Sequence, residues 1–391
     1  MGRKVIFVVL DGVGIGELPD ASLYGDQGTN TIGNIARALG GLHLPHLERL
    51  GLGRIAPVKG LDPRNPVEGC FGKMMERSKG KDSTTGHWEI AGIITEQAFP
   101  LYPNGFPAEV IQRFLDATGC KGILGNCPAS GTAIINELGT EHVRTGYPIV
   151  YTSGDSVFQI AAHEEVISLE QLYRICDTTR QRVMVSEHAV GRVIARPFFG
   201  QSGDFRRTQN RRDFSLKPPS DTVVDLLERD GIETVGIGKV TDLFAGRGFT
   251  RTIHTKTNAA GVEAIVKEGK AVSSGFIMAN LVDFDMLYGH RQDPEGFGRA
   301  LEEFDRSLPE ILGALNGQDL LILTADHGND PTDASTDHSR EYVPLLVTSP
   351  AGGKGVDLGT RQTFADAGKT VADFFEVPNT LSGTSFLSMM Q

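Results

Sequence analysis

The stretch LLILTADHGNDPTDASTDHSREYV, from Leu320 to Val343, indicates both an architecture and a chemistry for this chain. It opens with an apolar run, Leu320 to Thr324, typical of a strand buried in a parallel sheet. Two Asp-His pairs follow, Asp326-His327 at the end of the run and Asp337-His338 eleven residues later. A carboxylate and an imidazole at a strand end, with a further imidazole returned by a loop, favour a divalent-metal site over a loop of capping aspartates.

Two other apolar runs end in the same way. Lys4 to Leu10 is rich in β-branched residues and is followed by Asp11, and Ser274 to Val282 is followed by Asp285 and then by His290. The glycine spacing after Asp11 is GxGxG, which is a weak match to a dinucleotide-binding turn. Because the carboxyl ends of parallel strands meet at one edge of a sheet, the sequence predicts three carboxylates and three imidazoles there, enough for two divalent cations.

A run of small hydroxyl residues, Ser83-Thr84-Thr85-Gly86-His87, precedes a helix-like segment. Taken alone, it is typical of a helix cap. Beside a pair of divalent cations, however, a hydroxyl at a helix N-terminus can act as a nucleophile in phosphoryl transfer. Ser83 and Thr85 are both candidates for that role.

The middle of the chain has a different character. Between about 96 and 219 the strand-helix alternation weakens, glycines and prolines punctuate short elements, and most of the clustered arginines occur. We expect residues 96–219 to form an inserted α+β cap domain between two parts of a core domain, 1–95 and 220–391. The core is expected to be α/β, with a central mostly parallel sheet and helices on both faces. Pro344 to Thr348 is predicted as its last strand.

Composition limits the classes of function. The 391 residues are 39% hydrophobic, with a mean hydropathy of −0.15 and a net charge of −11, which disfavours nucleic-acid and membrane-surface partners. No apolar stretch is long enough to span a bilayer. The four cysteines show no metal-binding spacing, so we interpret them as reduced thiols of a cytoplasmic protein.

These segments together resemble the phosphopentomutase family of the alkaline-phosphatase superfamily. The similar motifs run nearly end to end and are DGVGIGE (11–17), GKDSTTGHWE (80–89), YTSGDS (151–156), VGRVIARP (190–197), NLVDFD (280–285), TADHGND (324–330) and TDHSREYVP (336–344). The resemblance implies the superfamily core with an inserted cap, two bound Mn²⁺ ions and a sugar bisphosphate activator. It also implies interconversion of ribose 1-phosphate or 2-deoxyribose 1-phosphate with the 5-phosphates, through a phosphoserine enzyme and a pentose bisphosphate.

The resemblance also implies roles for individual residues. One metal would be held by Asp11, Asp326 and His327 and the other by Asp285, His290 and His338, with Asp337 outside both sets. The nucleophile, which would bridge the metals, falls on Ser83, where the family usually has threonine; Thr85 stays the rival. The implied substrate contacts are Ser153, Asp155, Arg192, Ile194, Arg206, Arg207 and Lys239.

Two alternative functions stay open from sequence. The first is another enzyme of the superfamily, a phosphoglycerate mutase or a metal-dependent phosphatase, since the same core site would serve these reactions. The second is a metal-binding relative without catalysis, which the intact hydroxyl and six ligands disfavour.

Overall fold

The computed structural model describes residues 2–352 and 355–390, and the chain separates into two compact units. The first unit combines Met1–Ala98 with Pro218–Gln391, and the second is Phe99–Lys217. The chain therefore leaves the first unit once and returns to it once. Each unit contains its own sheet.

The first unit is built on an eight-stranded sheet with the order β10-β9-β11-β1-β12-β13-β2-β14. β1 (Lys4–Leu10) is fully buried and pairs in parallel with β11 (Gly275–Leu281) on one side and β12 (Leu320–Thr324) on the other. β9 (Thr234–Ile237) and β10 (Arg251–Ile253) extend the parallel part beyond β11. All three strands expected to carry the site thus lie side by side. Their continuous apolar runs suit strands that are covered on both faces.

The other edge of this sheet differs from the expectation. β13 (Val343–Thr348) runs antiparallel to both β12 and β2 (Cys70–Met74), and β14 (Asp357–Arg361) follows it in sequence and pairs in parallel with β2. The prediction that 344–348 is the last strand was therefore wrong. β14 is a half-exposed edge strand with a bulge near Gly359, so it lacks the apolar run by which a buried strand is found.

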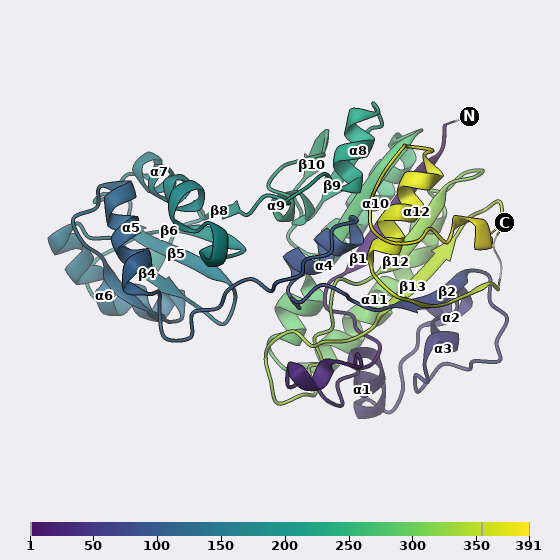
Figure 1. The fold of residues 1–391 in the computed structure, drawn as a ribbon. Helices are drawn as coiled ribbons and strands as arrows, with labels where there is room; N and C mark the ends of the chain where they lie inside the picture. The colour runs from purple at the N-terminus through teal and green to yellow at the C-terminus, as the bar shows by residue number, and fades with distance from the viewer. Residues whose placement is uncertain (1, 353–354, 391) are drawn as a thin grey trace. The chain divides into compact units, whose positions relative to one another are not determined.

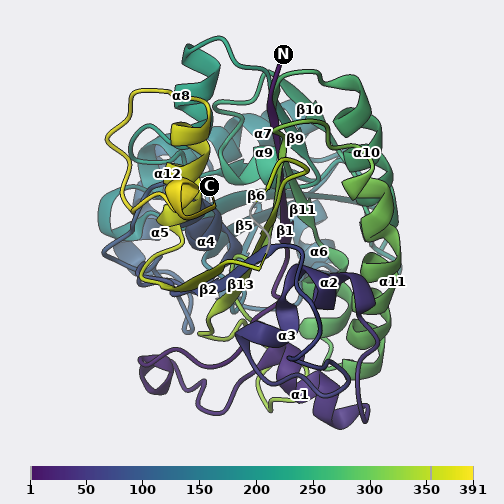
Figure 2. The same cartoon turned by 90° about the vertical axis from the view of Figure 1, so that its right-hand side faces the viewer.

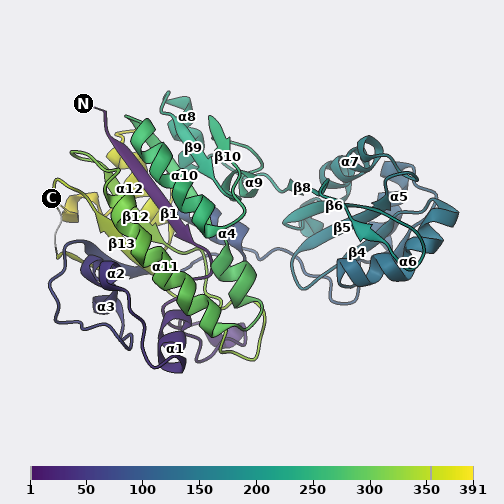
Figure 3. The same ribbon diagram turned by 180° about the vertical axis from the view of Figure 1, so that it is seen from behind.

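Helices cover both faces of the sheet, as Figure 2 shows. α10 (Asn258–Ala271) and α11 (Pro294–Leu312) lie together on one face, where Figure 3 shows them beside β1. The opposite face carries α4 (Ser83–Ile90), α8 (Val223–Arg229) and α12 (Ala365–Phe374). The shorter helices are α1 (Thr31–Ala38), α2 (Pro45–Leu50), α3 (Leu52–Ile55) and α9 (Val240–Leu243). This is the α/β layering predicted for the core.

The second unit is a smaller sheet with helices on both faces (Figure 1). Its strands are β3 (Leu124–Pro128), β4 (Ile149–Thr152), β5 (Val157–His163), β6 (Arg192–Phe199), β7 (Arg206–Arg207) and β8 (Arg212–Ser215). Parallel and antiparallel pairs are mixed, and both β7 and β8 pair with β6. Its helices are α5 (Ala108–Thr118), α6 (Gly131–Thr145) and α7 (Leu169–Thr178).

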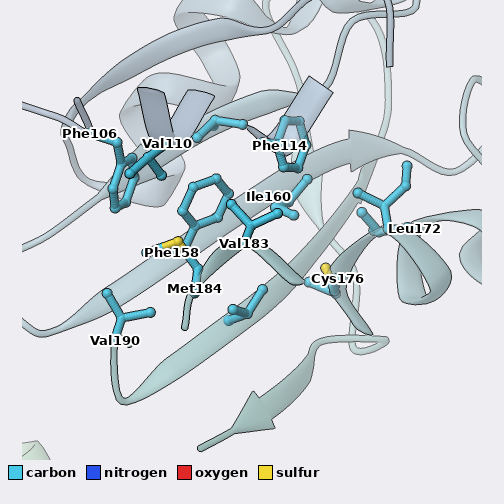
Figure 4. Close-up of a cluster of buried hydrophobic side chains, with 14 of the residues drawn as sticks. Phe106, Val110, Phe114, Phe158, Ile160, Leu172, Cys176, Val183, Met184 and Val190 are labelled. Carbon is cyan, nitrogen blue, oxygen red and sulfur yellow. The ribbon is translucent and has the colours of Figure 1, made fainter. Parts of the chain in front are cut away.

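Two apolar clusters hold this sheet between its helices. On one face, Phe114 of α5 and Leu172 of α7 pack with Phe158 and Ile160 of β5, as Figure 4 shows. On the other face, α6 packs Ile134 and Ile135 against Tyr151, Phe198 and neighbouring side chains. Burial on both faces makes the second unit a folded body with its own core. Across the described parts of both units, none of the helices combines the length and hydrophobicity that crossing a membrane requires.

Candidate metal centre

The three predicted carboxylates lie at neighbouring strand ends of the first unit. Leu10 of β1 is in register with Leu281 of β11, and Val9 is in register with Thr324 of β12. Asp11, Asp285 and Asp326 therefore come together just beyond one edge of the sheet, and each is at most 5% exposed. Burying three carboxylates together is unfavourable unless cations compensate their charge.

The imidazoles complete two groups with metal-binding spacing. The ligand atoms of Asp11, Asp326 and His327 lie within 4.8 Å of one another, and so do those of Asp285, His327 and His338. His327 belongs to both groups because its ring lies between Asp11, 3.3 Å from Nε2, and the ring of His338, 3.9 Å away between centroids. The structure thus brings two candidate sites into contact through one histidine.

His290 is the C-cap residue of η4 (Phe284–Gly289), and its side chain lies beside the second group. Its Nε2 lies 3.3 Å from Oδ2 of Asp285, and its ring centroid is 4.8 Å from that of His338. Its Nδ1 is 2.7 Å from the carbonyl oxygen of Thr336, which orients the ring. The six side chains predicted as ligands are therefore close together.

The electrostatics of the cluster reflect this crowding. Burial alone would lower the pKa of His327, but Asp326, Asp11 and Asp285 raise it to about 10. Burial would raise the pKa of Asp285, yet His338, His290 and His327 hold it well below its usual value. Carboxylates kept ionised in a buried site are the form that binds a divalent cation.

Several buried polar atoms at this site form no hydrogen bond. Among the described residues these are Oδ2 of Asp326, Nε2 of His338 and both carboxylate oxygens of Asp11. Their contacts are ion pairs: Asp326 with His87, His338 with Asp285 and Asp11 with Lys239. Buried polar atoms are normally satisfied, and exceptions mark functional positions. Mixed carboxylate and imidazole donors aimed at one another fit divalent metals.

Ser83 is the first residue of α4 and lies against this cluster. Its Oγ is 3.2 Å from Nε2 of His327 and 3.0 Å from the ammonium nitrogen of Lys239. Asp82 caps the helix by accepting hydrogen bonds from the amides of Thr84 and Thr85. The capping role therefore falls on Asp82, which leaves the Ser83 hydroxyl directed to the metal ligands.

The rival hydroxyl has another partner. Thr85 is buried, and its Oγ1 donates a hydrogen bond of 2.7 Å to Oδ2 of Asp82. α4 approaches the end of β12 so closely that a Cβ on Gly86 would collide with the carbonyl oxygen of Asp326. Glycine at position 86 is thus what allows the start of the helix to reach the cluster.

Comparison with known proteins identifies the family. The Metalloenzyme superfamily model matches residues 3–379. A phosphopentomutase from Dictyoglomus thermophilum is 57% identical over 389 residues, with 100% of this chain and 99% of the relative covered. A phosphopentomutase from Carboxydothermus hydrogenoformans is 58% identical, with 95% and 96% covered. The chain belongs to the phosphopentomutase family. The resemblance noted from the motifs is confirmed, and a divalent-metal site is what the superfamily and the two side-chain groups support.

Solved structures confirm the fold class of this phosphopentomutase-family chain. The PH0037 protein from Pyrococcus horikoshii matches with a TM-score of 0.51 at 15% identity, covering 98% of this chain and 99% of that one. A phosphoglycerate mutase from Leishmania mexicana matches with a TM-score of 0.50 at 13% identity, covering 98% and 97%. At these identities the likeness concerns the fold alone.

Two side chains that the sequence reasoning did not single out support the ligands. His87, one turn after Ser83, lies with Nδ1 3.0 Å from Oδ2 of Asp326 and 2.8 Å from the Ser83 carbonyl oxygen. Asn329 donates a hydrogen bond of 2.6 Å to Oδ1 of Asp285. Both lie within the matching motifs, and the i,i+4 spacing from Ser83 to His87 on α4 is the signal that could have found the histidine.

Asp337 and Lys239 complete the account of this site. Asp337 is about half exposed, accepts a hydrogen bond from the amide of His338 and lies 3.5 Å from Lys81, so it supports the loop. Lys239, implied as a substrate contact, pairs at 2.6 Å with Oδ2 of Asp11. Its ammonium group therefore lies beside the nucleophile candidate.

The other implied substrate contacts belong to the second unit. Arg192 lies 3.6 Å from Asp155 and 3.6 Å from Asp213, and Ile194 is buried two residues further along β6. Arg206 instead pairs with Asp204 and lies opposite Phe199, at the far end of β6. Seven residues of strand separate the two ends, about 23 Å. The structure therefore does not bring Arg192 and Arg206 together around one phosphate; Ser153 lies in the loop next to Asp155.

Proposed function

We propose that this chain interconverts ribose 1-phosphate or 2-deoxyribose 1-phosphate with the corresponding 5-phosphate. The observation that carries the proposal is the position of the Ser83 hydroxyl, 3.2 Å from the histidine that belongs to both candidate metal groups. A serine held there can take up a phosphoryl group and return it. Relatives named phosphopentomutase, at 57% and 58% identity over nearly the full chain, support the choice of substrate.

We assign two Mn²⁺ ions to this centre. Asp11, Asp326 and His327 would hold one and Asp285, His290 and His338 the other, and the Ser83 oxygen would be a further ligand. When bound, the ions would lower the pKa of the serine hydroxyl and neutralise charge on phosphoryl oxygens. His87 and Asn329 keep two of the carboxylates in place, because each contacts an oxygen of a ligand.

The reaction is then an exchange of phosphoryl groups between Ser83 and the sugar. Phosphorylated Ser83 gives its phosphoryl group to the free hydroxyl of a pentose monophosphate, which yields a pentose bisphosphate and the free serine. After the sugar turns round, Ser83 takes the other phosphoryl group and the isomeric monophosphate leaves. A sugar bisphosphate activator would supply the first phosphoryl group. Lys239, 3.0 Å from the serine oxygen, stabilises negative charge there.

Side chains of the second unit are assigned to the sugar and the non-reacting phosphate. Asp155 and Ser153 would accept hydrogen bonds from sugar hydroxyls, and Ile194 would pack against the ring. Arg192 would hold the non-reacting phosphate through its guanidinium fork. The family resemblance also implied Arg206 and Arg207 for that phosphate, but they lie at the opposite end of β6 from Arg192, so we assign the phosphate to Arg192.

The decisive assay uses purified, Mn²⁺-loaded protein, ribose 5-phosphate and a catalytic amount of a sugar bisphosphate. Ribose 1-phosphate and free phosphate are followed together, with Ser83→Ala as the matched control. Isomer without phosphate is the expected result. Phosphate without isomer would instead identify a phosphatase, turnover only of phosphoglycerates a phosphoglycerate mutase, and no turnover with metals bound a non-catalytic relative.

Location is part of the proposal as well. Among the described residues, Cys120, Cys127 and Cys176 are free thiols, and Cys127 is exposed. Exposed free thiols persist in the reducing cytoplasm. We therefore place the enzyme there, acting on small phosphorylated sugars and on neither nucleic acids nor membranes, in line with its net charge of −11.

A further inference from the structure

The second unit contains a pocket of about 460 Å³. Of the residues that line it, only Arg206 and Arg207 were implied as substrate contacts. It lies where the first turn of α6 meets β6, β7 and the start of β8, so every lining residue belongs to one unit. Its polar lining consists of four arginines and two threonines, namely Arg196, Arg206, Arg207, Arg211, Thr132 and Thr208. A pocket with this lining is suited to an anion.

Only half of that positive charge is compensated. Arg206 pairs with Asp204 at 2.9 Å, and Arg211 pairs with Asp213 at 2.6 Å. Arg196 and Arg207 form no ion pair with any carboxylate in the described part of the chain. Arg196 donates its Nε hydrogen to Gln159 at 3.0 Å, and its pKa is lowered by burial and by repulsion from Arg211 and Arg207. The pocket therefore holds two unbalanced positive charges, the number that matches a phosphate dianion.

A buried hydroxyl group lies close to the start of α6 and to Arg207. The side chain of Tyr151 on β4 is fully buried, and among the described residues its hydroxyl group has no hydrogen-bond partner. That oxygen is 2.6 Å from where a Cβ on Gly131 would stand, and Nη1 of Arg207 is 3.8 Å from the same point. Glycine at position 131 thus leaves room for the hydroxyl beside the first residue of α6. Buried polar atoms without a partner are rare, and each one calls for a functional or structural explanation.

The start of α6 adds favourable electrostatics. The helix has 15 residues, and its N-cap residue, Ser130, makes no side-chain hydrogen bond to the first turn. The first backbone N–H groups of a helix and its dipole attract anions, most strongly phosphate. Thr132, in that first turn, lines the pocket. The first turn of α6 and the arginines therefore line one volume, and the tyrosine hydroxyl lies beside Gly131 at the start of the same helix.

We propose that this pocket binds the phosphate group of a small molecule, at a site separate from the one that Arg192 would form for the substrate. Arg192 and Arg196 are four residues apart on β6, about 13 Å along the strand. Asp213 lies between the two sites, 3.6 Å from Arg192 and 2.6 Å from Arg211. The ligand is either inorganic phosphate or a sugar phosphate, and the volume is sufficient for a sugar beside the phosphate. The proposal does not rest on mutase activity, because binding is measured without turnover.

Binding is tested on the full chain loaded with Mn²⁺, by calorimetric titration with inorganic phosphate and, separately, with ribose 5-phosphate. In Arg196→Gln, one class of phosphate site should weaken by about tenfold or more, the effect of losing a hydrogen bond to a charged group. The matched control is Arg212→Gln, the neighbouring arginine of β8, which stacks on Tyr173 and Phe214 instead of lining the pocket. The control should bind like the wild type.

Tyr151→Phe separates the site from a general effect on folding. It removes an oxygen that has no partner within the described chain, so the melting temperature of the phosphate-free protein should stay the same or rise. Phosphate binding should nevertheless weaken by about tenfold. Tighter pocket binding of ribose 5-phosphate than of phosphate would assign the site to a sugar phosphate, and equal binding would assign it to free phosphate.

The proposal is overturned if Arg196→Gln and Tyr151→Phe bind both probes as the wild type does. Its failure is distinguishable from failure of the proposed function, because Ser83→Ala should keep the pocket and lose phosphoryl transfer. A wild-type protein that isomerises ribose 5-phosphate but shows no site sensitive to Arg196 would disprove the pocket and leave the mutase assignment intact.

Discussion

The metal centre and the arginine pocket of the second unit differ in the sign of their charge and in how deeply their charged side chains are buried. At the metal centre, Asp11, Asp285 and Asp326 sit on adjacent parallel strands and are almost completely buried. In the pocket, the side chains of Arg206, Arg207 and Arg211 are partly exposed and come from short edge strands and their connections. One site has an excess of negative charge and the other an excess of positive charge.

The difference shows what burial does to a binding site. A buried cluster has few alternative arrangements, so its ligands are fixed by packing and by neighbours such as His87 and Asn329. Exposed arginines keep their rotamer freedom and lose it on binding, which weakens affinity per contact. We therefore expect substitutions at the metal centre to affect the rate of reaction and stability strongly, and substitutions around the arginines to affect binding moderately.

The largest effect should come from Ser83→Ala. Removing the nucleophile should abolish the phosphoenzyme and lower kcat by about a thousandfold or more, as expected when covalent catalysis is lost. Thr85→Ala should keep the phosphoenzyme, since the Thr85 hydroxyl is engaged with Asp82. Mass spectrometry of protein incubated with a sugar bisphosphate measures both. A phosphorylated Ser83→Ala protein together with an unmodified Thr85→Ala protein would reverse the assignment.

Removal of the metals should have the next largest effect, which is a decrease in the stability of the folded protein. Ions present at about a thousand times their Kd contribute about 4 kcal/mol to the free energy of unfolding. Chelation should therefore lower the melting temperature of the wild type by several degrees. Asp285→Asn, which alters one candidate group, should retain less than half of that metal-dependent shift in calorimetric scans. An unchanged melting temperature on chelation of the wild type would contradict a buried metal centre.

Glu341 provides a pH-dependent comparison within the core. Burial raises its pKa to about 7, against hydrogen bonds from Thr31, Ser339 and the amide of Gly16 that lower it. The folded protein therefore binds a proton more tightly than the unfolded chain, so stability is full below the usual pKa of glutamate and falls as pH rises to about 7. The loss is about 3 kcal/mol. Urea unfolding from pH 4.5 to 8 should show this slope in the wild type.

The matched variant for that experiment is Glu341→Gln, which cannot titrate. Its unfolding free energy should lose the downward slope between pH 4.5 and 7, although its absolute stability should be lower because an amide cannot accept all four hydrogen bonds. Equal slopes in the two proteins would show that Glu341 is ionised throughout. In that case the four donors, and not burial, determine its charge.

The two sites also differ in how far sequence alone could predict them. The carboxylates of the metal centre were predictable because continuous apolar runs identify Lys4–Leu10 and Leu320–Thr324 as buried strands, and parallel strands end at one edge. β14 could not be predicted, since a half-exposed edge strand has no apolar run. The pocket could not be predicted either, because its arginines come together only when β7 and β8 pair with β6. The basic residues were visible as a concentration, but the buried hydroxyl of Tyr151 depends on Gly131, which no local pattern reveals.

The smallest effect should come from Arg192→Lys, and it tests whether the two ends of β6 act separately. Lysine keeps the charge but loses the planar fork, so KM for ribose 5-phosphate should rise by about tenfold with kcat little changed. Arg206→Lys should leave KM within about twofold. Arg206 lies about 23 Å from Arg192 along the strand, and it is already paired with Asp204. Steady-state kinetics of both variants give the comparison. A larger rise in KM for Arg206→Lys than for Arg192→Lys would move the substrate phosphate to the pocket end of β6, and the site that we assign to a second phosphate would then be part of the substrate site.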